Sequence, residues 1–237
     1  MKILAFDGTA KIASVAVLDG ERVLGRSTVD NGLTQSELLL PMAEDLLRSL
    51  KMDFSDVELF AVAVGPGSFT GVRIGVSLVK GLAFGRGVPC VEVSTLEALA
   101  YNLRGLSGLA VPCMDARRGQ FYTATFLLIG ESAGVVRIDD DSAMSLKELV
   151  ENVDSLNPEK IYVCGDGREK VFAELNFLKY PVETTPPLLA DADAASVGAL
   201  AYKKYMKGES VTDTELSPVY LRLPQAERER LEREKNN

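Results

Sequence analysis

Short apolar runs alternate along the first half of the chain with longer segments whose apolar residues recur at helical spacing. Runs rich in β-branched residues are typical of strands, and apolar positions three and four apart are typical of helices. Thr34 and Glu37 form a capping-box pattern, which predicts where the first helix begins. The pattern predicts strands over 2–7, 12–18 and 21–29, a helix over 34–50, a strand over 59–64, a helix over 71–85, a strand over 89–93 and a helix over 95–103.

The same order begins again at Leu109, which indicates an internal duplication with a shortened second copy. We expect strands over 109–115, 120–129 and 135–138, a helix over 145–153, a strand over 160–164, a helix over 168–175, a Pro-rich loop over 181–187 and a helix over 193–207. A β-β-β-α-β-α unit used twice is the plan of the actin-like ATPase and sugar-kinase superfamily, so we expect an α/β fold of that type. The expected parts are an N-terminal lobe over 1–104, a C-terminal lobe over 105–224 and a charged tail over 225–237, which we interpret as a solvated segment.

The predicted helix over 71–85 contains three glycines, Gly71, Gly75 and Gly81. Each costs roughly 1 kcal/mol of helix propensity relative to alanine, so another part of a protein must approach the backbone where the side chains are missing. We therefore interpret all three as close-packing positions. The groove formed by Gly71 and Gly75 is expected to face the sheet of the same lobe.

The turn GPGSFTG at 65–71 leads into this helix and has two interpretations. It is either a sharp strand-to-helix connection or a phosphate cradle, since free N–H groups at a helix N-terminus favour anions. Val72 follows Gly71 where a Walker loop needs lysine, and the dinucleotide spacing GxGxxG is not met. The glycines are therefore no nucleotide fingerprint, and the structural connection is the favoured interpretation.

Composition restricts the chemistry further, because none of the 237 residues is histidine. This removes the commonest general base, the imidazole metal ligand and every Ser-His-Asp or Cys-His arrangement. The 34 acidic and 26 basic residues give a net charge of −8, the wrong sign for autonomous nucleic-acid binding, so any such role depends on a partner. The three cysteines lie in apolar strand-like runs and are expected to be buried thiols. Without a signal peptide or an apolar run of membrane-spanning length, we expect a cytoplasmic protein.

Aspartates end two equivalent predicted strands. Asp7, Gly8 and Thr9 form a turn where ATPases of this superfamily place an acid near Mg²⁺ and phosphate; the alternative is a tight turn closed by the hydrogen bonds of Asp7. Asp115 is either the second carboxylate of a pair across a cleft or part of a surface turn with Arg117 and Arg118. An ATP-dependent kinase or ATPase that uses Asp7 is thus one candidate function.

Two further motifs carry weaker signals. The run 139–141 consists of three aspartates, but it lacks the spaced ligands of a calcium loop and indicates a solvated turn. The sequence CGDG at 164–167 is the only candidate in the second half for the glycine pair that would hold an adenosine.

Several segments together resemble the TsaB family, also called YeaZ, whose members act in threonylcarbamoyladenosine synthesis on tRNA. The resemblance covers nearly the whole chain except the charged tail. Its motifs are ILAFDGTAKIASVAVLDG at 3–20, GPGSFTGVRIGVSLVKGLAFGRGVPCVEVSTLEALA at 65–100, MDARRGQFYTATF at 114–126, CGDG at 164–167 and PVYLR at 218–222.

The resemblance implies a non-catalytic scaffold that pairs with TsaD, joined by the ATPase TsaE, for N6-threonylcarbamoylation of adenosine 37 in ANN-decoding tRNAs. TsaD binds its metal through histidines on its first long helix, whereas this chain has Gln35, Ser36, Glu37 and Leu39 there. The resemblance therefore implies the accessory subunit, with no catalytic residue, metal or cofactor of its own and ATP only at a shared interface. It also implies contact with tRNA only through the complex, and a homodimer as the alternative assembly without TsaD.

The two long helices of the N-terminal lobe are the implied TsaD-binding surface. They carry more apolar surface than contact with one sheet would bury. The alternative to a partner protein is that the other lobe of the same chain covers the remaining apolar surface. The expected interface residues are Leu38, Leu39, Met42, Leu46, Ile74, Leu78 and Leu82.

Overall fold

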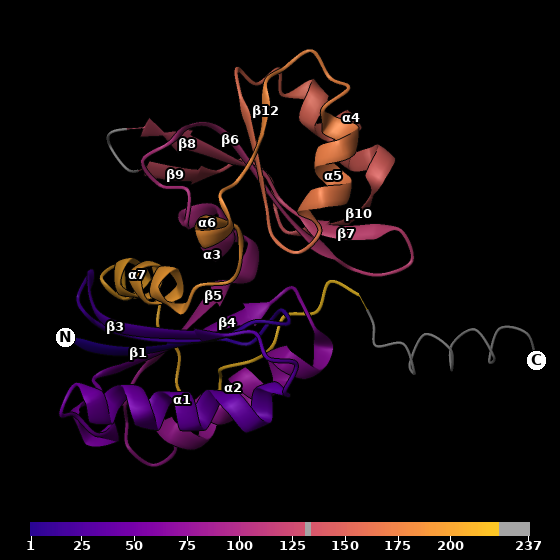
Figure 1. The fold of residues 1–237 in the computed structure, drawn as a ribbon. Coiled ribbons are helices and arrows are strands. Elements are labelled where there is room, and N and C mark those ends of the chain that lie inside the picture. Colours follow the sequence, from indigo (N-terminus) through magenta and orange to yellow (C-terminus); the bar gives the residue numbers. More distant parts are fainter. Residues whose placement is uncertain (131–133, 223–237) are drawn as a thin grey trace, which may run out of the picture.

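Two β-sheets, one in each half of the chain, organise the structure, a computed structural model that describes residues 1–130 and 134–222 (Figure 1). The first sheet has the strand order β3-β2-β1-β4-β5. Its first three strands form an antiparallel meander, and β1, β4 and β5 run parallel. The strands are β1 (Lys2–Asp7), β2 (Ala13–Asp19), β3 (Arg22–Val29), β4 (Leu59–Gly65) and β5 (Cys90–Ser94).

Helices cover both faces of this first sheet, which explains why β1 and β4 are apolar along nearly their whole length. On one face lie α1 (Gln35–Ser49) and α2 (Phe69–Ala83), and on the other α3 (Thr95–Tyr101) and α7 (Ala194–Tyr205) (Figure 1). A 3₁₀ turn, η1 (Phe54–Asp56), precedes β4. The predicted capping box is confirmed, since the Thr34 amide donates to Glu37 Oε2 over 2.9 Å.

The second sheet has the path β10-β7-β6-β11-β12, with β8 paired to β6 and β9 paired to β8. Helices α4 (Leu146–Ser155) and α5 (Arg168–Leu175) pack on one face, and α6 (Pro187–Ala190) lies between the lobes beside α3 (Figure 1). The strands are β6 (Ser107–Asp115), β7 (Gln120–Thr123), β8 (Phe126–Ile129), β9 (Gly134–Arg137), β10 (Ser142–Ser145), β11 (Ile161–Cys164) and β12 (Val182–Thr184).

Three details of the second lobe differ from the sequence-based expectation. The strand predicted over 120–129 divides at residues 124–125, because β7 pairs with the end of β6 and β8 pairs with its beginning. The strand β10 was not predicted, since its four residues are mostly small and polar and pair with β7. The predicted Pro-rich loop over 181–187 contains β12, which owes its strand conformation to parallel pairing with β11.

The expected boundary between the lobes is corrected by α7. We assigned residues 105–224 to the C-terminal lobe, but α7 packs against the first sheet and shares a core with Ile3, Ala5 and Leu18. Gly198 makes this approach close, because a Cβ atom there would overlap Leu18 Cδ1. Because α7 is rich in alanine, its hydrophobic pattern does not indicate which of the two sheets it covers.

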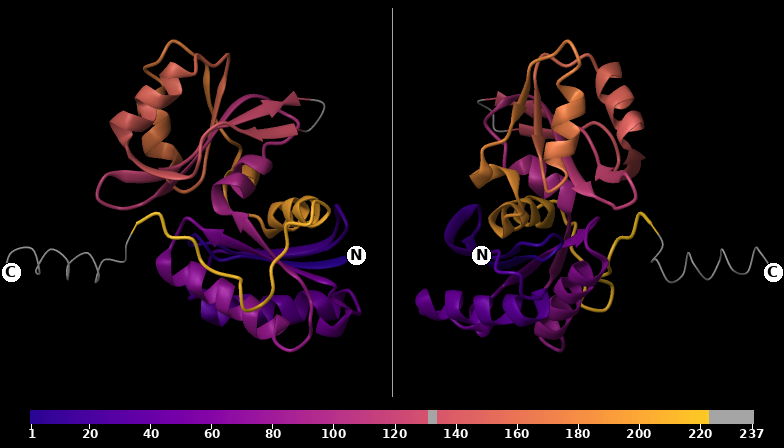
Figure 2. Two further views of the ribbon diagram at one scale, coloured as in Figure 1. Left: turned by 180° about the vertical axis from the view of Figure 1, so that it is seen from behind. Right: turned by 45° about the vertical axis from the view of Figure 1, so that its right-hand side comes forward.

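The chain after α7 also returns to the first lobe, as the yellow segment in both views of Figure 2 shows. Val211 pairs with Cys90 at the free edge of β5, and Leu216 is buried in the core between the sheet and α2. The charged tail predicted over 225–237 lies outside the described residues.

The three α2 glycines differ in what surrounds them. A Cβ atom on Gly71 would overlap the carbonyl oxygen of Gly8, and one on Gly75 would lie 3.4 Å from Val62 Cγ2 of β4. Gly71 and Gly75 therefore face parts of their own lobe. Close packing does not explain Gly81, which is exposed and has nothing within 4 Å of an added Cβ atom.

The cysteines Cys90, Cys113 and Cys164 are buried and free, as predicted. Burial raises the pKa of the Cys90 thiol to about 11, so this thiol is protonated at neutral pH. Within the described residues, no helix combines the length and apolar character that a membrane crossing requires.

Two alanine substitutions in the same helix should have opposite effects on stability. Gly71→Ala forces the turn of Gly8 to move and should lower the free energy of unfolding by about 1 to 3 kcal/mol or more. Gly81→Ala removes a flexible residue without a clash and should be neutral or stabilising by up to roughly 1 kcal/mol. Urea denaturation of both variants and the wild type checks this. Equal losses in the two variants would show that the Gly71 contact carries no special weight.

Candidate functional site

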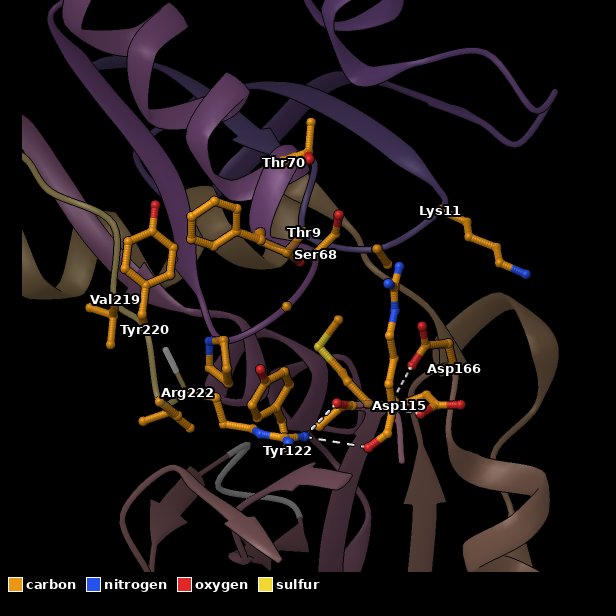
Figure 3. A pocket seen from close by; sticks show the side chains of 18 residues that line it. Thr9, Lys11, Ser68, Thr70, Asp115, Tyr122, Asp166, Val219, Tyr220 and Arg222 are labelled. Atoms are coloured by element: carbon orange, nitrogen blue, oxygen red, sulfur yellow. Dashed lines mark hydrogen bonds between the residues drawn. The ribbon is translucent and has the colours of Figure 1, made fainter. Parts of the chain in front are cut away.

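A cleft of about 530 Å³ lies between the two lobes. Figure 3 shows that side chains from both lobes and from the C-terminal segment point toward it. Its walls come from the turn after β1, the start of α2, the end of β6 and the last described residues. They include 9–11, 66–70, 114–117, Tyr122, Asp166 and 219–222.

The turn after β1 is closed by its own hydrogen bonds. Asp7 Oδ1 accepts bonds from the Thr9 amide over 3.0 Å and from Thr9 Oγ1 over 2.6 Å. The Asp7 side chain is 1% exposed, and Gly8 and Thr9 are also buried. Burial raises the pKa of Asp7 above its ordinary value of 3.8, while the two bonds from Thr9 act in the opposite direction.

The first turn of α1 packs over this turn. Gln35 Nε2 donates to the carbonyl of Ala10 over 2.8 Å, and a Cβ atom on Gly8 would lie 3.1 Å from Leu39 Cδ1. Ser36 and Glu37 are exposed, and Glu37 caps Thr34, whose hydroxyl bond holds the pKa of that carboxyl below its ordinary value. Gln35, Glu37 and Leu39, which stand where TsaD is expected to have its metal-binding histidines, thus make local structural contacts here.

The start of α2 seals the other side of the turn. The Ser68 amide donates to the Thr9 carbonyl over 2.7 Å, and a Cβ atom on Gly67 would lie 2.5 Å from that same oxygen. Ser68 Oγ accepts the Gly71 amide over 3.3 Å and caps the helix. The glycines of GPGSFTG therefore allow a close strand-to-helix connection, while Ser68, Phe69 and Thr70 still line the cleft.

The second carboxylate, Asp115, is engaged locally. It accepts the Arg117 amide over 2.7 Å and lies 3.3 Å from Lys170 Nζ, and its own amide donates to Asp166 Oδ1 over 3.0 Å. Burial raises the pKa of Asp166, partly offset by that backbone bond. Arg118, the other arginine of this turn, has a left-handed backbone with φ 55°. The arrangement is a structured turn with two acids at the cleft wall.

The remaining sequence candidates make local structural contacts. In CGDG, Gly165 is needed because a Cβ atom there would overlap the Cys113 carbonyl, and Gly167 packs on Phe121 in the same way. Asp139 accepts from Asn152 Nδ2 over 2.9 Å, and Asp141 accepts from Ser94 Oγ over 2.6 Å. In the part of the chain that the structure describes, no three His, Cys, Asp or Glu residues lie together as a metal site would need.

The sequence did not point to the aromatic group at the mouth of the cleft. The Phe69 and Tyr220 rings lie 4.8 Å apart, and the Arg73 guanidinium lies 3.8 Å from the centre of the Phe69 ring. Arg73 Nε also donates to Tyr220 Oη over 2.8 Å. The motifs GPGSFTG and PVYLR, which contain Phe69 and Tyr220, were the signals that could have drawn attention to this group.

The expected partner-binding residues divide into two sets. Leu38, Leu39 and Met42 are buried in the first-lobe core, so the expectation that they face a partner does not hold. They point at the sheet because helical spacing puts them on the same side as Ala43 and Leu47. The partly exposed set, which packs at the edge of this core, is Leu46, Ile74, Leu78 and Leu82.

Comparison with solved structures confirms the class of fold. The component A of (R)-2-hydroxyglutaryl-CoA dehydratase from Acidaminococcus fermentans has a TM-score of 0.52 at 11% identity, covering 87% of this chain and 99% of that chain. At such identity the similarity shows the fold alone. The protein is a two-lobed member of the actin-like ATPase and sugar-kinase fold class, as predicted.

Sequence comparisons point to two related families. The sequence model of the family "TsaD: tRNA N6-adenosine threonylcarbamoyltransferase" matches residues 34–227. The Escherichia coli K12 protein "tRNA threonylcarbamoyladenosine biosynthesis protein TsaB" is 30% identical over 225 residues, which are 94% of this chain and 95% of that protein. The protein of the same name from Bacillus subtilis 168 is 40% identical over 126 residues, about half of each chain at 53% and 55%.

A solved structure agrees with these sequence matches. "YeaZ from Pseudomonas aeruginosa" has a TM-score of 0.77 at 27% identity, covering 93% of this chain and 99% of that chain. The chain belongs to the TsaB (YeaZ) family, and its match to the TsaD model makes it a relative of that transferase as well.

The buried carboxyl of Asp7 predicts a particular pH dependence. Because its pKa is raised in the folded state, the folded protein holds this proton more tightly than the unfolded chain does. The wild type should therefore lose stability relative to Asp7→Asn as the pH rises from 3.8 through the raised folded pKa, and should stay less stable at neutral pH. The asparagine oxygen can still accept both bonds from Thr9.

Thermal unfolding of the two proteins between about pH 3 and pH 7, a window that spans the ordinary aspartate range, checks this order. A wild type that gains stability relative to the variant as the pH rises would mean that Thr9 stabilises the Asp7 charge by more than burial costs.

Proposed function

We propose that this chain is the non-catalytic subunit of a tRNA threonylcarbamoyladenosine synthesis complex. It pairs with TsaD, is joined by TsaE, and enables N6-threonylcarbamoylation of adenosine 37 in ANN-decoding tRNAs. It holds no cofactor alone, and ATP binds only at an interface shared with a partner. It meets tRNA only through the complex, and a homodimer is the alternative assembly where TsaD is absent.

The observation that carries this proposal is the closed turn at residues 7–9. A carboxyl with 1% exposure, whose Oδ1 atom accepts two bonds from Thr9, has almost no surface at which to meet a magnesium ion or a phosphate. The chain also has no histidine with which to bind a metal as TsaD does. The names of the TsaB relatives support the pathway.

The outer surface of α1 and α2 is the surface we assign to TsaD. These helices lie side by side on the first sheet, away from the second lobe (Figure 1). Leu46 and Leu78 are partly exposed there, and Leu40 and Phe84 add exposed apolar area, with Phe84 77% exposed. Apolar side chains at the exposed edge of a packed core are suited to a helix-to-helix interface.

A second candidate function is an ATPase that works alone, and the cleft of about 530 Å³ is the observation that favours it. The cleft is large enough for a small-molecule ligand, and the start of α2 lines it. The burial of Asp7 counts against this function, since the turn would have to open before its carboxyl could act.

Leu78→Glu should leave the isolated protein folded and weaken its pairing with the cognate TsaD by about tenfold or more, because a central apolar contact is replaced by a buried charge. The measurement is the mass of the mixed proteins in solution over a range of concentrations. Circular dichroism of the variant establishes that it is folded, and formation of modified adenosine with TsaE added should fall in parallel.

Phe177→Glu is the matched control, since Phe177 is 86% exposed and follows α5 on the second lobe. It should pair with TsaD as the wild type does. Unfolding of Leu78→Glu would show that this side chain is part of the core, and wild-type pairing by a folded variant would exclude α2 as the interface.

A further inference from the structure

Residues 211–222, here called the C-terminal strap, are fixed to the first lobe along most of their length. Val211 and Cys90 exchange two backbone hydrogen bonds of 2.8 and 2.9 Å at the edge of β5. Leu216 is fully buried in the first-lobe core, and the Ser217 amide donates to Glu92 Oε1 over 2.7 Å. The beginning of the strap is therefore part of the first lobe.

The strap then passes the carboxyl end of β4 at very short range. The Val219 amide donates to the Val64 carbonyl over 2.8 Å. Gly65 comes next in β4, with φ 115°, and a Cβ atom on it would lie 2.6 Å from the Val219 carbonyl oxygen. The first glycine of GPGSFTG is thus required both by its backbone conformation and by the strap.

Tyr220 connects the strap to the start of α2. Its hydroxyl accepts from Arg73 Nε over 2.8 Å, and its ring lies 4.8 Å from that of Phe69. Further along α2, Lys80 Nζ donates to the Thr214 carbonyl over 3.2 Å. Three side chains of α2 therefore contact the strap directly.

Arg222 makes the contact that leaves the first lobe. Its Nη1 atom donates to the Ala116 carbonyl over 2.7 Å and approaches the Arg117 carbonyl at 3.4 Å (Figure 3). Both carbonyls belong to the turn between β6 and β7, where Arg117 has a left-handed backbone with φ 63°. A charged guanidinium bonded to a backbone carbonyl is among the stronger hydrogen bonds that proteins form.

We propose that the C-terminal strap is a tie that limits how far the two lobes separate, with Arg222 as its closing contact. The other polar contacts between the lobes include those of Asn102, the C-cap of α3, which donates to the Leu189 carbonyl over 3.2 Å and to the Asp191 carbonyl over 2.8 Å. In Figure 1, α3 and α6 lie between the lobes on one side, and the end of the strap lies on the other. Contact on both sides of the cleft restrains a hinge motion, and loss of Arg222 frees one side.

The proposal gives a physical role to PVYLR, which the proposed function leaves unexplained. Val219 fixes the strap to β4, Tyr220 fixes it to α2, and Arg222 reaches the second lobe. The helix α2 is also the one assigned to TsaD, so docking of TsaD there would change the angle between the lobes through Tyr220 and Arg222. This consequence rests on the proposed function, whereas the tie itself does not.

The test measures the distance between the lobes within one chain of the isolated protein, diluted with unlabelled protein so that labels on two different copies do not contribute. All three native cysteines are buried, so spin labels can be directed to Glu44→Cys on α1 and Lys147→Cys on α4, two exposed positions. In this background Arg222→Ala should broaden the distance distribution and shift it to longer values. The amides of Ala116 and Gln120, which hold the receiving turn, should exchange hydrogen about tenfold faster, the factor expected for the loss of one such hydrogen bond.

Arg118→Ala is the control, because it removes a positive charge from the same turn without touching the strap contact. It should reproduce the wild-type distances. An Arg222→Ala protein that is folded and gives the wild-type distance distribution and exchange rates would overturn the tie. Since TsaD is absent from these measurements, that failure would not bear on the proposed pairing.

Discussion

The contact between the carbonyl oxygen of Gly8 and the backbone of Gly71 is the constraint on which the first lobe depends. It brings the turn after β1 and the start of α2 so close that no side chain fits between them. Asp7 is consequently buried and bonded to Thr9, and Leu39 closes the turn from the side of α1. The Asp7 carboxyl is thus enclosed by packing, while Thr9 still lines the cleft beside it.

Local patterns were sufficient to predict most elements. The Thr34–Glu37 capping box and the helix over 168–175 agree with the structure, because both depend on residues close together in sequence. Tertiary contacts decided the rest. The strand β12 exists through its pairing with β11, and α7 covers the first sheet although it follows the second in sequence.

In the candidate site, too, local patterns predicted some features and tertiary contacts decided the others. The glycine spacing in α2 predicted close approach, but Gly71 and Gly81 look alike in sequence and differ only in what lies beside them. Helical periodicity marked Leu39 of α1 and Leu78 of α2 alike as apolar positions. In the structure Leu39 faces the sheet, whereas Leu78 lies at the rim of the core. The role of Arg222 depends on a carbonyl more than a hundred residues away, which no local pattern contains.

The central claim is that this chain supplies a surface and not a catalytic carboxyl. The most direct measurement is ATP turnover and adenosine modification by the isolated protein, by TsaD with TsaE, and by all three together, using both wild type and Asp7→Asn. The account predicts no turnover by the isolated chain, and modification that requires the chain but is unchanged in the variant. ATP hydrolysis by the isolated wild type that disappears in Asp7→Asn would contradict it.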